Sequence, residues 1–546
     1  MERRAAIGRW VAAVIACGFF ALVTAEPRAG AQTQPSAAKN CCTAIPAPRK
    51  STNSRKPAAG AAARFASRAD LLLDVAPLNK GDWGILIADA ETGETLFEEN
   101  SDKYFVPASN MKLFTTALAL AKLGVDYRFR TTLESRAAIS PDGILAGDLA
   151  LVGRGDPNLS NRKFPYELKE EFDGPPEKVL AELADALVLK GVKEISGDVV
   201  GDDSYFPRER YANGWEIDDM VWEYGAAISA IVVDDNTVAL MLTPAEEAGL
   251  PVQASVVPTT PDFTLENDVT TSAFDVKSDL RLIREPGANL VVIKGTMPAK
   301  AASRKLVLAI QEPALHAAAL LKQLLQDRGI KVAGAARARH QIPDSPETPV
   351  VLAEHISIPL GDSVKLVNKI SQNLHAEILL RTAARQSGAW STPEDLVKFP
   401  EDFYAKAGIA AGDVIQTDGS GLSRHDLVTP RAVVALLKYA QTQTWFDTYY
   451  ASLPQAGVDG TLEDRLKNSS AAGRIHAKTG SVEHVRTLSG FAETAGGRRL
   501  IFSFLSNNQG GKSHEAADAL GGLCVAMIEE FNSAPAKRAQ EHKHPQ

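Results

Sequence analysis

The pattern of hydrophobic and polar positions predicts an α/β protein whose sheet strands lie near both ends of the folded chain. Residues 84–89 and 94–97 are strand-like and flank Glu91-Thr-Gly93, an arrangement typical of a β-hairpin. Near the other end, segments with the alternating or continuously apolar pattern of sheet strands are 475–480, 487–491 and 500–505. A strand pair therefore begins the core, and a set of strands ends it.

Helical patterns follow the first hairpin and return after about residue 355. The segment from Met111 to Leu123 is apolar and rich in alanine, and Gly124 follows it. This predicts a buried helix with Ser109 at its first turn. Further helices are expected at 363–370, 374–387, 430–443 and 515–531. Cys524 lies in an apolar stretch of the last helix, so we expect it in the core.

Between about residues 130 and 350, the pattern predicts a separate, β-rich body. Strand-like segments predominate, and two helices, 177–190 and 314–328, interrupt them. Each helix is followed by Gly-[Val/Ile]-Lys and a second glycine, which suggests a weak internal repeat. Two unrelated helix–glycine–strand units would give the same pattern. An insertion of about 220 residues in one loop is tolerable because the entropy cost of loop closure grows only logarithmically with length.

The N-terminal residues 1–25 are predicted to be an export signal. Arg3, Arg4 and Arg9 precede an apolar run of about 14 residues, whereas a membrane-spanning helix needs about 20. An uncleaved membrane anchor and lipidation at Cys17 are the alternatives. An export signal implies that the folded protein works in the periplasm or on the outer side of the cell envelope.

Two further segments lack a hydrophobic period. Residues 26–64, which include Cys41 and Cys42, are rich in Ala, Pro, Ser, Lys and Arg and predict a disordered linker. The last segment, 533–546, is a polar tail. The remaining chain divides into a discontinuous core domain and an inserted accessory domain, with the expected boundaries 65–132 and 350–532 for the core and 133–349 for the insertion.

Composition and charge exclude several classes of protein. The 546 residues contain 59 Lys+Arg and 67 Asp+Glu, a net charge of −8, which argues against a binder of nucleic-acid phosphates. Four cysteines in a chain of this length cannot form a disulfide framework. Hydrophobic residues make up 45% of the chain, enough for a large globular core.

Ser109-Asn-Met-Lys112 is the first segment that carries chemistry. A serine hydroxyl is a weak nucleophile that needs a base, and a spacing of three places both side chains on one helix face. Burial disfavours the ammonium form of a lysine, so Lys112 could take the serine proton. The spacing alone is weak evidence because it also occurs at Ser36–Lys39 and Ser160–Lys163.

Two further short motifs follow Ser109 in the chain. Ser371-Gln-Asn373 lies between two predicted helices, where the serine could relay a proton; simple helix capping by Ser371 is the alternative. Lys478-Thr-Gly-Ser481 occurs once, in a predicted strand whose edge could bind an extended peptide. Gly480 would let a substrate backbone approach closely. Thr479 and Ser481, with Lys478, would suit a terminal carboxylate.

The order Ser-x-x-Lys, Ser-x-Asn, Lys-Thr-Gly resembles penicillin-binding proteins and serine β-lactamases. The separation of 262 positions between Ser109 and Ser371 resembles that in the class C low-molecular-mass penicillin-binding proteins, the type 4 D-alanyl-D-alanine carboxypeptidase/endopeptidases of peptidase family S13. The segments 201–206 and 418–424 also resemble this family. The resemblance implies a multidomain α/β fold: a serine β-lactamase/transpeptidase-like core, with an antiparallel sheet and a helical subdomain, that carries a large β-rich insertion.

The resemblance also implies a role for each motif residue. Ser109 would be acylated, Lys112 would be its base, Ser371 and Lys478 would complete a proton relay, and Asn373 would position the substrate. Backbone N–H groups of Ser109 and Ser481 would form an oxyanion hole. The free end of a diaminopimelate side chain would meet Asp202 and Arg424. A turn residue and a surface ion pair, respectively, are the alternatives for these last two residues.

The expected function is therefore that of a serine DD-peptidase that cleaves D-Ala-D-Ala or D-Ala-diaminopimelate bonds of peptidoglycan stem peptides and is acylated by β-lactams. Neither a metal nor a cofactor is implied, because the histidines near the motifs, His375, His425, His476 and His484, lack metal-ligand spacing. A serine β-lactamase and a non-catalytic peptidoglycan-binding relative are the alternatives. The sequence leaves open a peripheral association with membrane or wall and a homo-oligomer.

Overall fold

The computed structural model describes residues 60–532, apart from 261–262, 286, 343–347, 389 and 391. The predicted signal peptide, the predicted linker up to residue 59 with Cys41 and Cys42, and the polar tail lie outside the described residues. Within the described part of the chain, every helix is too short or too polar to span a membrane.

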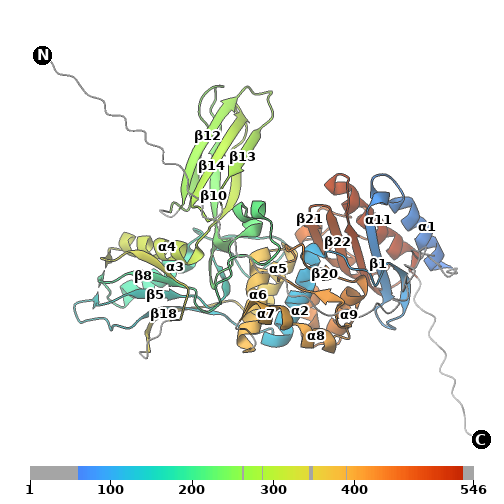
Figure 1. Cartoon of the computed structure of the whole chain (residues 1–546), viewed down its shortest axis with the longest axis horizontal. Coiled ribbons are helices and arrows are strands. Elements are labelled where there is room, and N and C mark those ends of the chain that lie inside the picture. The colour runs from blue at the N-terminus through green and yellow to red at the C-terminus, as the bar shows by residue number, and fades with distance from the viewer. Residues whose placement is uncertain are drawn as a thin grey trace, which may run out of the picture. The chain divides into compact units, whose positions relative to one another are not determined.

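A five-stranded antiparallel sheet joins the two ends of the described chain (Figure 1). Its strand order is β2-β1-β23-β22-β21, and the strands are β1 (Asp82–Asp89), β2 (Thr95–Glu99), β21 (Ile475–Val482), β22 (Val485–Glu493) and β23 (Arg499–Asn507). β1 pairs with β23 along its whole length, from Asp82 opposite Asn507 to Asp89 opposite Leu500. The predicted hairpin and C-terminal strands are confirmed, and this pairing unites them in one sheet.

β22 and β23 are buried on both sides, because helices cover both faces of this sheet. On one face, α1 (Ala61–Leu73) and α11 (Ser513–Glu530) pack against each other, and α11 contacts β22. Phe65, Phe502 and Cys524 belong to the apolar cluster between these elements. The predicted terminal helix and the core position of Cys524 are therefore confirmed.

A cluster of helices around α2 (Met111–Leu123) covers the other face. α2 is buried from Met111 to Leu120 because this stretch is apolar apart from Lys112 and two threonines. It ends at Gly124, whose φ of 84° lies in the left-handed region that favours glycine. The other helices of the cluster are α5 (Leu360–Lys369), α6 (Asn373–Gln386), α7 (Pro393–Lys398), α8 (Glu401–Lys406), α9 (Pro430–Ala440) and α10 (Phe446–Ser452).

A second five-stranded sheet, of order β17-β8-β5-β3-β18, forms the insertion's centre (Figure 1). Its strands are β3 (Arg130–Ser135), β5 (Leu149–Val152), β8 (Val199–Asp202), β17 (Ala336–Arg339) and β18 (Val350–Ile356). Helices α3 (Lys178–Leu189) and α4 (Pro313–Asp327) share an apolar cluster with this sheet. The strands by which the chain enters and leaves the insertion, β3 and β18, pair with each other. The expected boundaries at 132/133 and 349/350 therefore fall inside or beside strands of the inserted sheet.

The two segments that suggested an internal repeat lie side by side. β7 (Glu194–Ile195) pairs in parallel with β16 (Lys331–Val332), and β8 pairs in parallel with β17. The preceding helices, α3 and α4, contact each other. Gly191 and Gly329 follow these helices with φ values of 79° and 82°. The two helix–glycine–strand units thus occupy equivalent places in one layered arrangement.

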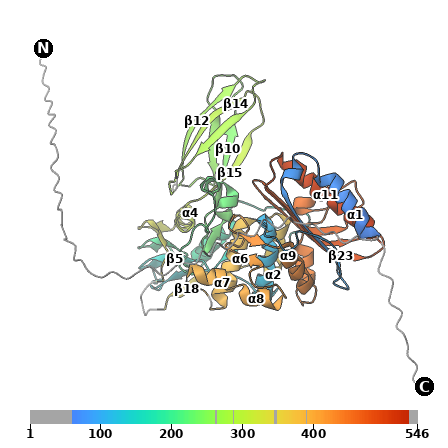
Figure 2. The same ribbon diagram turned by 45° about the vertical axis from the view of Figure 1, so that its right-hand side comes forward.

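Smaller sheets and 3₁₀ turns complete the inserted part (Figure 2). The sheets β11-β10-β15 and β12-β14-β13 contain β10 (Thr237–Thr243), β11 (Gln253–Val257), β12 (Thr264–Ser272), β13 (Asp279–Ile283), β14 (Leu290–Pro298) and β15 (Arg304–Ala309). β6 (Asp156–Leu159) pairs with β9 (Ile231–Val233). The turns η3 (Ile217–Val221), η4 (Glu223–Gly225) and η5 (Asp234–Asn236) contribute to the site described next.

Candidate active site

A pocket of about 500 Å³ brings together residues from the core domain and from the insertion. Five of the residues selected from the sequence line it, namely Ser109, Ser371, Asn373, Arg424 and Ser481. The remaining lining residues are Glu216, Asp219, Tyr224, Gly421, Leu422, Val482 and Glu483. Segments more than 300 residues apart in the chain thus meet in one cavity.

Ser109 lies in the 3₁₀ turn η2 (Ala108–Asn110), which leads directly into α2. Lys112 lies within the first turn of α2, and its Nζ is 2.8 Å from Ser109 Oγ. The same Nζ donates to Asn373 Oδ1 at 2.6 Å and to the carbonyl oxygen of Ser420 at 2.7 Å. The structure therefore brings Lys112 beside Ser109, as the spacing of three predicts.

Burial determines the protonation of Lys112, whose side chain is fully excluded from solvent. Desolvation lowers the pKa of Lys112 to about 7, although the negative charges of Asp418, Glu377 and Asp426 oppose this shift. A lysine with this pKa is half neutral near physiological pH. It can therefore take a proton from a neighbouring hydroxyl.

A second serine–lysine pair completes the polar part of the pocket. Ser371 connects α5 with α6 at a φ of 64°, and Lys478 on β21 places its Nζ 2.9 Å from Ser371 Oγ. Burial and the charge of Lys112 lower the pKa of Lys478 well below its usual value. The side chain that caps α6 is Gln372, which accepts a hydrogen bond from Leu374 N. The structure thus gives helix capping to Gln372 and leaves Ser371 facing Lys478.

The Lys-Thr-Gly segment of β21 runs directly behind the nucleophile. A Cβ on Gly480 would lie 2.8 Å from Pro107 O and 3.1 Å from Ser109 N. The protein's own backbone therefore already requires a glycine here, and the approach of a substrate backbone to Gly480 stays a prediction. Thr479 Oγ1 lies 2.7 Å from Thr461 Oγ1, and Ser481 lines the pocket.

The segment Asp418–Arg424 folds into a loop behind Ser109. Its Asp418 accepts hydrogen bonds from the backbone N–H groups of Ser420, Gly421 and Ser423, at 2.6 to 3.0 Å. Gly421 has a φ of 79°, and a Cβ there would lie only 1.8 Å from Ala108 O. The loop thereby presents the Ser420 carbonyl to the lysine of the first motif and places Arg424 at the pocket wall.

The structure does not bring Asp202 to this pocket. Asp202 ends β8 in the inserted sheet, where its Oδ2 accepts from Arg339 Nη1 at 3.1 Å and its Oδ1 accepts from Ser204 N at 3.0 Å. Its carboxylate lines a different cavity of about 560 Å³ together with Arg339. The backbone of β8 fixes this position, because the strand is paired on both sides.

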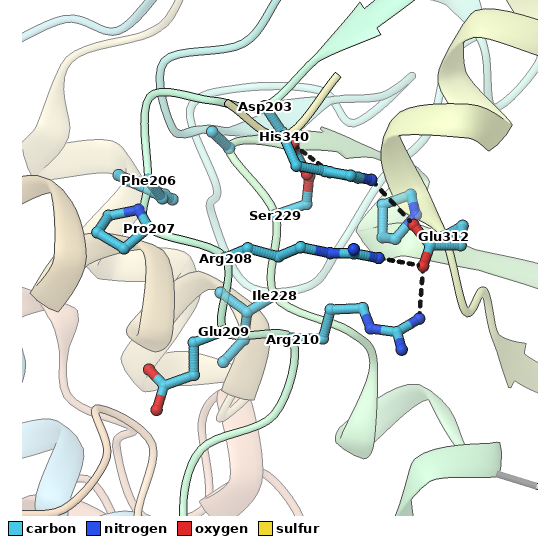
Figure 3. Close-up of a pocket in the computed structure, with 12 residues that line it drawn as sticks. Asp203, Phe206, Pro207, Arg208, Glu209, Arg210, Ile228, Ser229, Glu312 and His340 are labelled. Atoms are coloured by element: carbon cyan, nitrogen blue, oxygen red, sulfur yellow. Dashed lines mark hydrogen bonds and ion pairs between the residues drawn. The ribbon is translucent and has the colours of Figure 1, made fainter. Parts of the chain in front are cut away.

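The neighbouring Asp203 also serves the insertion (Figure 3). Its Oδ1 lies 2.8 Å from His340 Nδ1, and His340 Nε2 lies 3.5 Å from a Glu312 oxygen. Glu312 in turn accepts from Arg208 at 2.7 Å and from Arg210 at 2.6 Å. The segment Gly201–Phe206, which resembles the family, therefore forms ion pairs within the insertion and does not line the pocket that contains Ser109.

Residues that the sequence analysis missed enter the pocket from η3 and η4. Asp219 lies beside Tyr224, and the Tyr224 hydroxyl forms a hydrogen bond with the carboxyl group of Asp219. Burial raises the pKa of Asp219. The carbonyl of Tyr224 accepts from Asn373 Nδ2 at 2.8 Å. Asp219 is thus the aspartate that shares a pocket with Arg424. In the sequence, Asp219 belongs to a short acidic segment after Trp215, and no pattern there distinguishes a pocket residue from a residue of an exposed turn.

A buried ion pair ties the insertion to the Ser371–Asn373 turn. Asp235 in η5 binds both terminal nitrogens of Arg162, and one of these contacts is 2.8 Å long. The same carboxylate accepts from Gln372 Nε2 at 2.9 Å and lies 2.8 Å from His375 Nε2. Burial opposes the charge of Asp235, but Arg162 and His375 keep its pKa below the usual value. The insertion therefore holds the turn that carries the second motif.

Together these contacts place a buried lysine beside a serine, the arrangement that an acyl-serine hydrolase needs. The sequence profile of the D-Ala-D-Ala carboxypeptidase 3 (S13) family matches residues 66–525. The chain belongs to this family of serine peptidases. The resemblance that the three motifs carry is confirmed.

Relatives of known name and structure agree with this assignment. The chain is 33% identical over 453 residues to a D-alanyl-D-alanine carboxypeptidase of Actinomadura sp. (strain R39), covering 81% of this chain and 80% of the relative. It is 28% identical over 425 residues to the D-alanyl-D-alanine carboxypeptidase DacB of Haemophilus influenzae, covering 77% of this chain and 84% of the relative. The crystal structure of penicillin-binding protein 4 from H. influenzae superposes with a TM-score of 0.73 at 26% identity, covering 86% of this chain and 99% of that one. The expected fold class is confirmed.

Proposed function

We propose that this protein is an exported DD-peptidase that cleaves peptidoglycan stem peptides on the carboxyl side of D-alanine through an ester on Ser109. The observation that carries the proposal is the 2.8 Å contact between Ser109 Oγ and the fully buried Lys112 Nζ. D-Ala-D-Ala and D-Ala-diaminopimelate bonds share the same acyl half. One acyl-enzyme therefore serves both carboxypeptidase and endopeptidase reactions, which differ only in the leaving amine.

The contacts of Lys112 support its role as the base. A neutral amine has two N–H bonds and one lone pair, and two carbonyl oxygens, of Asn373 and Ser420, accept hydrogen bonds from Nζ. When both hydrogens point to these acceptors, the lone pair is left for the hydroxyl of Ser109. The two carbonyls thus orient the base as well as hold it.

Acylation then follows from this geometry. Ser109 Oγ attacks the carbonyl carbon of the penultimate D-alanine while its proton moves to Lys112 Nζ. Backbone N–H groups of Ser109 and Ser481 would stabilise the oxyanion, a contribution that can reach several kcal/mol. The tight packing of Gly480 against Ser109 N supports this arrangement, because it holds the two backbone segments together.

Expulsion of the amine and hydrolysis complete the cycle. The C–N bond breaks as the departing nitrogen takes up the proton that Lys112 received from Ser109, relayed through Ser371 Oγ, which Lys478 Nζ contacts at 2.9 Å, so that Lys112 becomes neutral again. Water then attacks the ester, and neutral Lys112 accepts a proton of that water and passes it to Ser109 Oγ, which leaves as the free hydroxyl. Asn373, whose position is supported by its contacts with Lys112 and the Tyr224 carbonyl, would bind the acyl chain.

Substrate recognition uses the strand edge and the far end of the pocket. An extended stem peptide would pair with β21, with its terminal carboxylate near Thr479 and Ser481. The zwitterionic end of a diaminopimelate side chain would meet Asp219 and Arg424, which have opposite charges and line the same pocket. Asp219 thus takes the role that the sequence analysis gave to Asp202.

A labelled penicillin tests the proposal. We expect covalent labelling of the purified protein, loss of label in Ser109→Ala, and release of D-alanine from an acyl-D-Ala-D-Ala peptide. Defined monomeric and cross-linked muropeptides measure the carboxypeptidase and endopeptidase rates separately. An unlabelled protein without peptidase activity would leave a non-catalytic wall-binding protein. Rapid turnover of nitrocefin, rather than a persistent acyl-enzyme, would make the protein a β-lactamase.

A further inference from the structure

Arg424 is held between two carboxylate side chains of the pocket wall. Its Nε donates to Glu216 Oε1 at 2.5 Å. Its Nη1 donates to the main-chain oxygen of Glu483 at 3.1 Å, and its Nη2 lies 4.0 Å from a carboxylate oxygen of Glu483. A substrate carboxylate that binds Arg424 must therefore compete with Glu216 for the guanidinium.

The segment that carries Glu216 is anchored to the loop that carries Arg424. Trp215 is buried and donates from Nε1 to Asp418 Oδ2 at 2.8 Å. Two residues before Trp215, the Asn213 carbonyl accepts from Ser423 Oγ at 2.7 Å. Both hydrogen bonds precede the Glu216–Arg424 pair in each segment and fix the two backbones that carry it. The side chain of Glu216 is itself 52% exposed, so the pair is a partly exposed one on fixed backbones.

The charge of the pocket wall favours a cation. The charged residues that line the pocket are Glu216, Asp219, Glu483 and Arg424, three carboxylates against one guanidinium. With all four ionised, this end of the pocket carries a net charge of −2. An ammonium group is attracted there, whereas a free carboxylate is repelled by Glu216 and Glu483 unless it displaces Glu216 from Arg424.

We propose that Glu216 is a specificity-determining residue, which competes for Arg424 and so weakens the binding of the free carboxylate of a diaminopimelate end. The substrate class thereby widens to stem peptides whose diamino acid presents an ammonium group to Asp219 without that carboxylate, as in a lysine or an amidated diaminopimelate residue. This inference rests on the proposed function, because it concerns the same pocket. It adds a charge preference that the motifs do not contain.

The experiment compares two acyl-peptides ending in D-Ala-D-Ala that differ only in a free or amidated diaminopimelate carboxyl group. The measured quantity is the ratio of kcat/KM for the free acid to kcat/KM for the amide. Glu216→Gln should raise this ratio about threefold to fivefold, the range that an ion pair of up to about 1 kcal/mol corresponds to. The matched control Glu223→Gln removes a nearby negative charge outside the pocket lining and should leave the ratio unchanged.

A double-mutant cycle with Arg424→Ala separates competition for the guanidinium from general charge. In the Arg424→Ala background, Glu216→Gln should raise the ratio less, because only the general repulsion between Glu216 and the carboxylate is then removed. An unchanged or lowered ratio in Glu216→Gln alone, or an equal rise in both backgrounds, would overturn the inference. D-Alanine release by the parent enzyme is read in the same assay. If neither peptide is cleaved, the proposed function fails and the inference fails with it, whereas cleavage with an unchanged ratio overturns only the inference.

Discussion

Two Ser-x-x-Lys segments of the described chain have the same spacing but different surroundings. In the core domain, Lys112 is fully buried and its Nζ lies 2.8 Å from Ser109 Oγ. In the insertion, the side chain of Lys163 is 53% exposed, and its Nζ lies 3.6 Å from the carboxylate of Glu171. The hydroxyl of Ser160 instead accepts a hydrogen bond from a nearby backbone N–H group. Spacing alone therefore does not suit a lysine to act as a base; burial beside the serine distinguishes Lys112, the proposed base, from Lys163.

The second segment still matters to the site, through a residue that the motif does not specify. Arg162, between Ser160 and Lys163, is nearly buried and binds Asp235. Asp235 holds Gln372 within the Ser371–Asn373 turn. The core segment thus contains the proposed reacting groups, and the inserted segment supplies a cation that helps to fix the turn.

The largest expected effect is on the rate of acylation, which should depend on the core Ser-x-x-Lys segment and not on the inserted one. Ser109→Ala and Lys112→Ala should each lower the rate of acylation by at least about 10³-fold, because the nucleophile and its base act as a unit. The matched variants Ser160→Ala and Lys163→Ala should acylate at the parent rate. Stopped-flow measurement with a chromogenic β-lactam gives these rates. A comparable loss in Ser160→Ala would show that the second segment also takes part in the reaction.

The next effect concerns the support that the insertion gives to the Ser371–Asn373 turn through Arg162 and Asp235. Arg162→Ala leaves the buried Asp235 carboxylate without its cation, and breaking a buried ion pair costs about 3–5 kcal/mol. Urea unfolding should show this loss, and the protein that remains folded should acylate more slowly because the Ser371 turn loses its anchor. The adjacent control Lys163→Ala should change neither quantity. Equal unfolding midpoints for the two variants would contradict the role of the Arg162–Asp235 pair.

The pH dependence of the acylation rate distinguishes a buried lysine from an exposed lysine as the base. Because burial lowers the pKa of Lys112 to about 7 and only its neutral form accepts a proton, acylation should rise with pH and level off above about 7. Two pH units below that value, the rate should be about hundredfold lower. A limb centred near 10, where an exposed lysine titrates, would show that Lys112 is not the base.

The smallest effect compares the two aspartates. Asp219→Asn should lower kcat/KM about tenfold for a peptide with a charged diaminopimelate end, the loss expected for a charge-assisted contact of about 1.4 kcal/mol. For a minimal acyl-D-Ala-D-Ala peptide, the change should be small. Asp202→Asn, whose carboxylate pairs with Arg339 in the insertion, should leave the ratio of the two substrates unchanged. A selective loss in Asp202→Asn would restore the assignment made from the sequence.

Local patterns were sufficient for much of the fold. The apolar, alanine-rich run before Gly124 predicted α2 because burial of a helix on all sides needs that composition. The strand patterns at both ends predicted β1, β2 and β21–β23, but their union in one sheet depends on pairing across more than 400 residues. The predicted boundary at 132/133 cuts β3 and the one at 349/350 falls directly before β18, because pairing between these two strands leaves no mark in either one alone.

The sequence by itself determined the three motifs, their order and therefore the family and the class of reaction, because these depend on residue types and spacing. Tertiary structure decided which aspartate shares a pocket with Arg424, and it formed the ion pairs between Glu216 and Arg424 and between Arg162 and Asp235. These contacts join segments that lie far apart in the chain, and many surface segments carry similar charges. Burial also decided which lysine loses its proton, because desolvation depends on the packing of the whole core around Lys112.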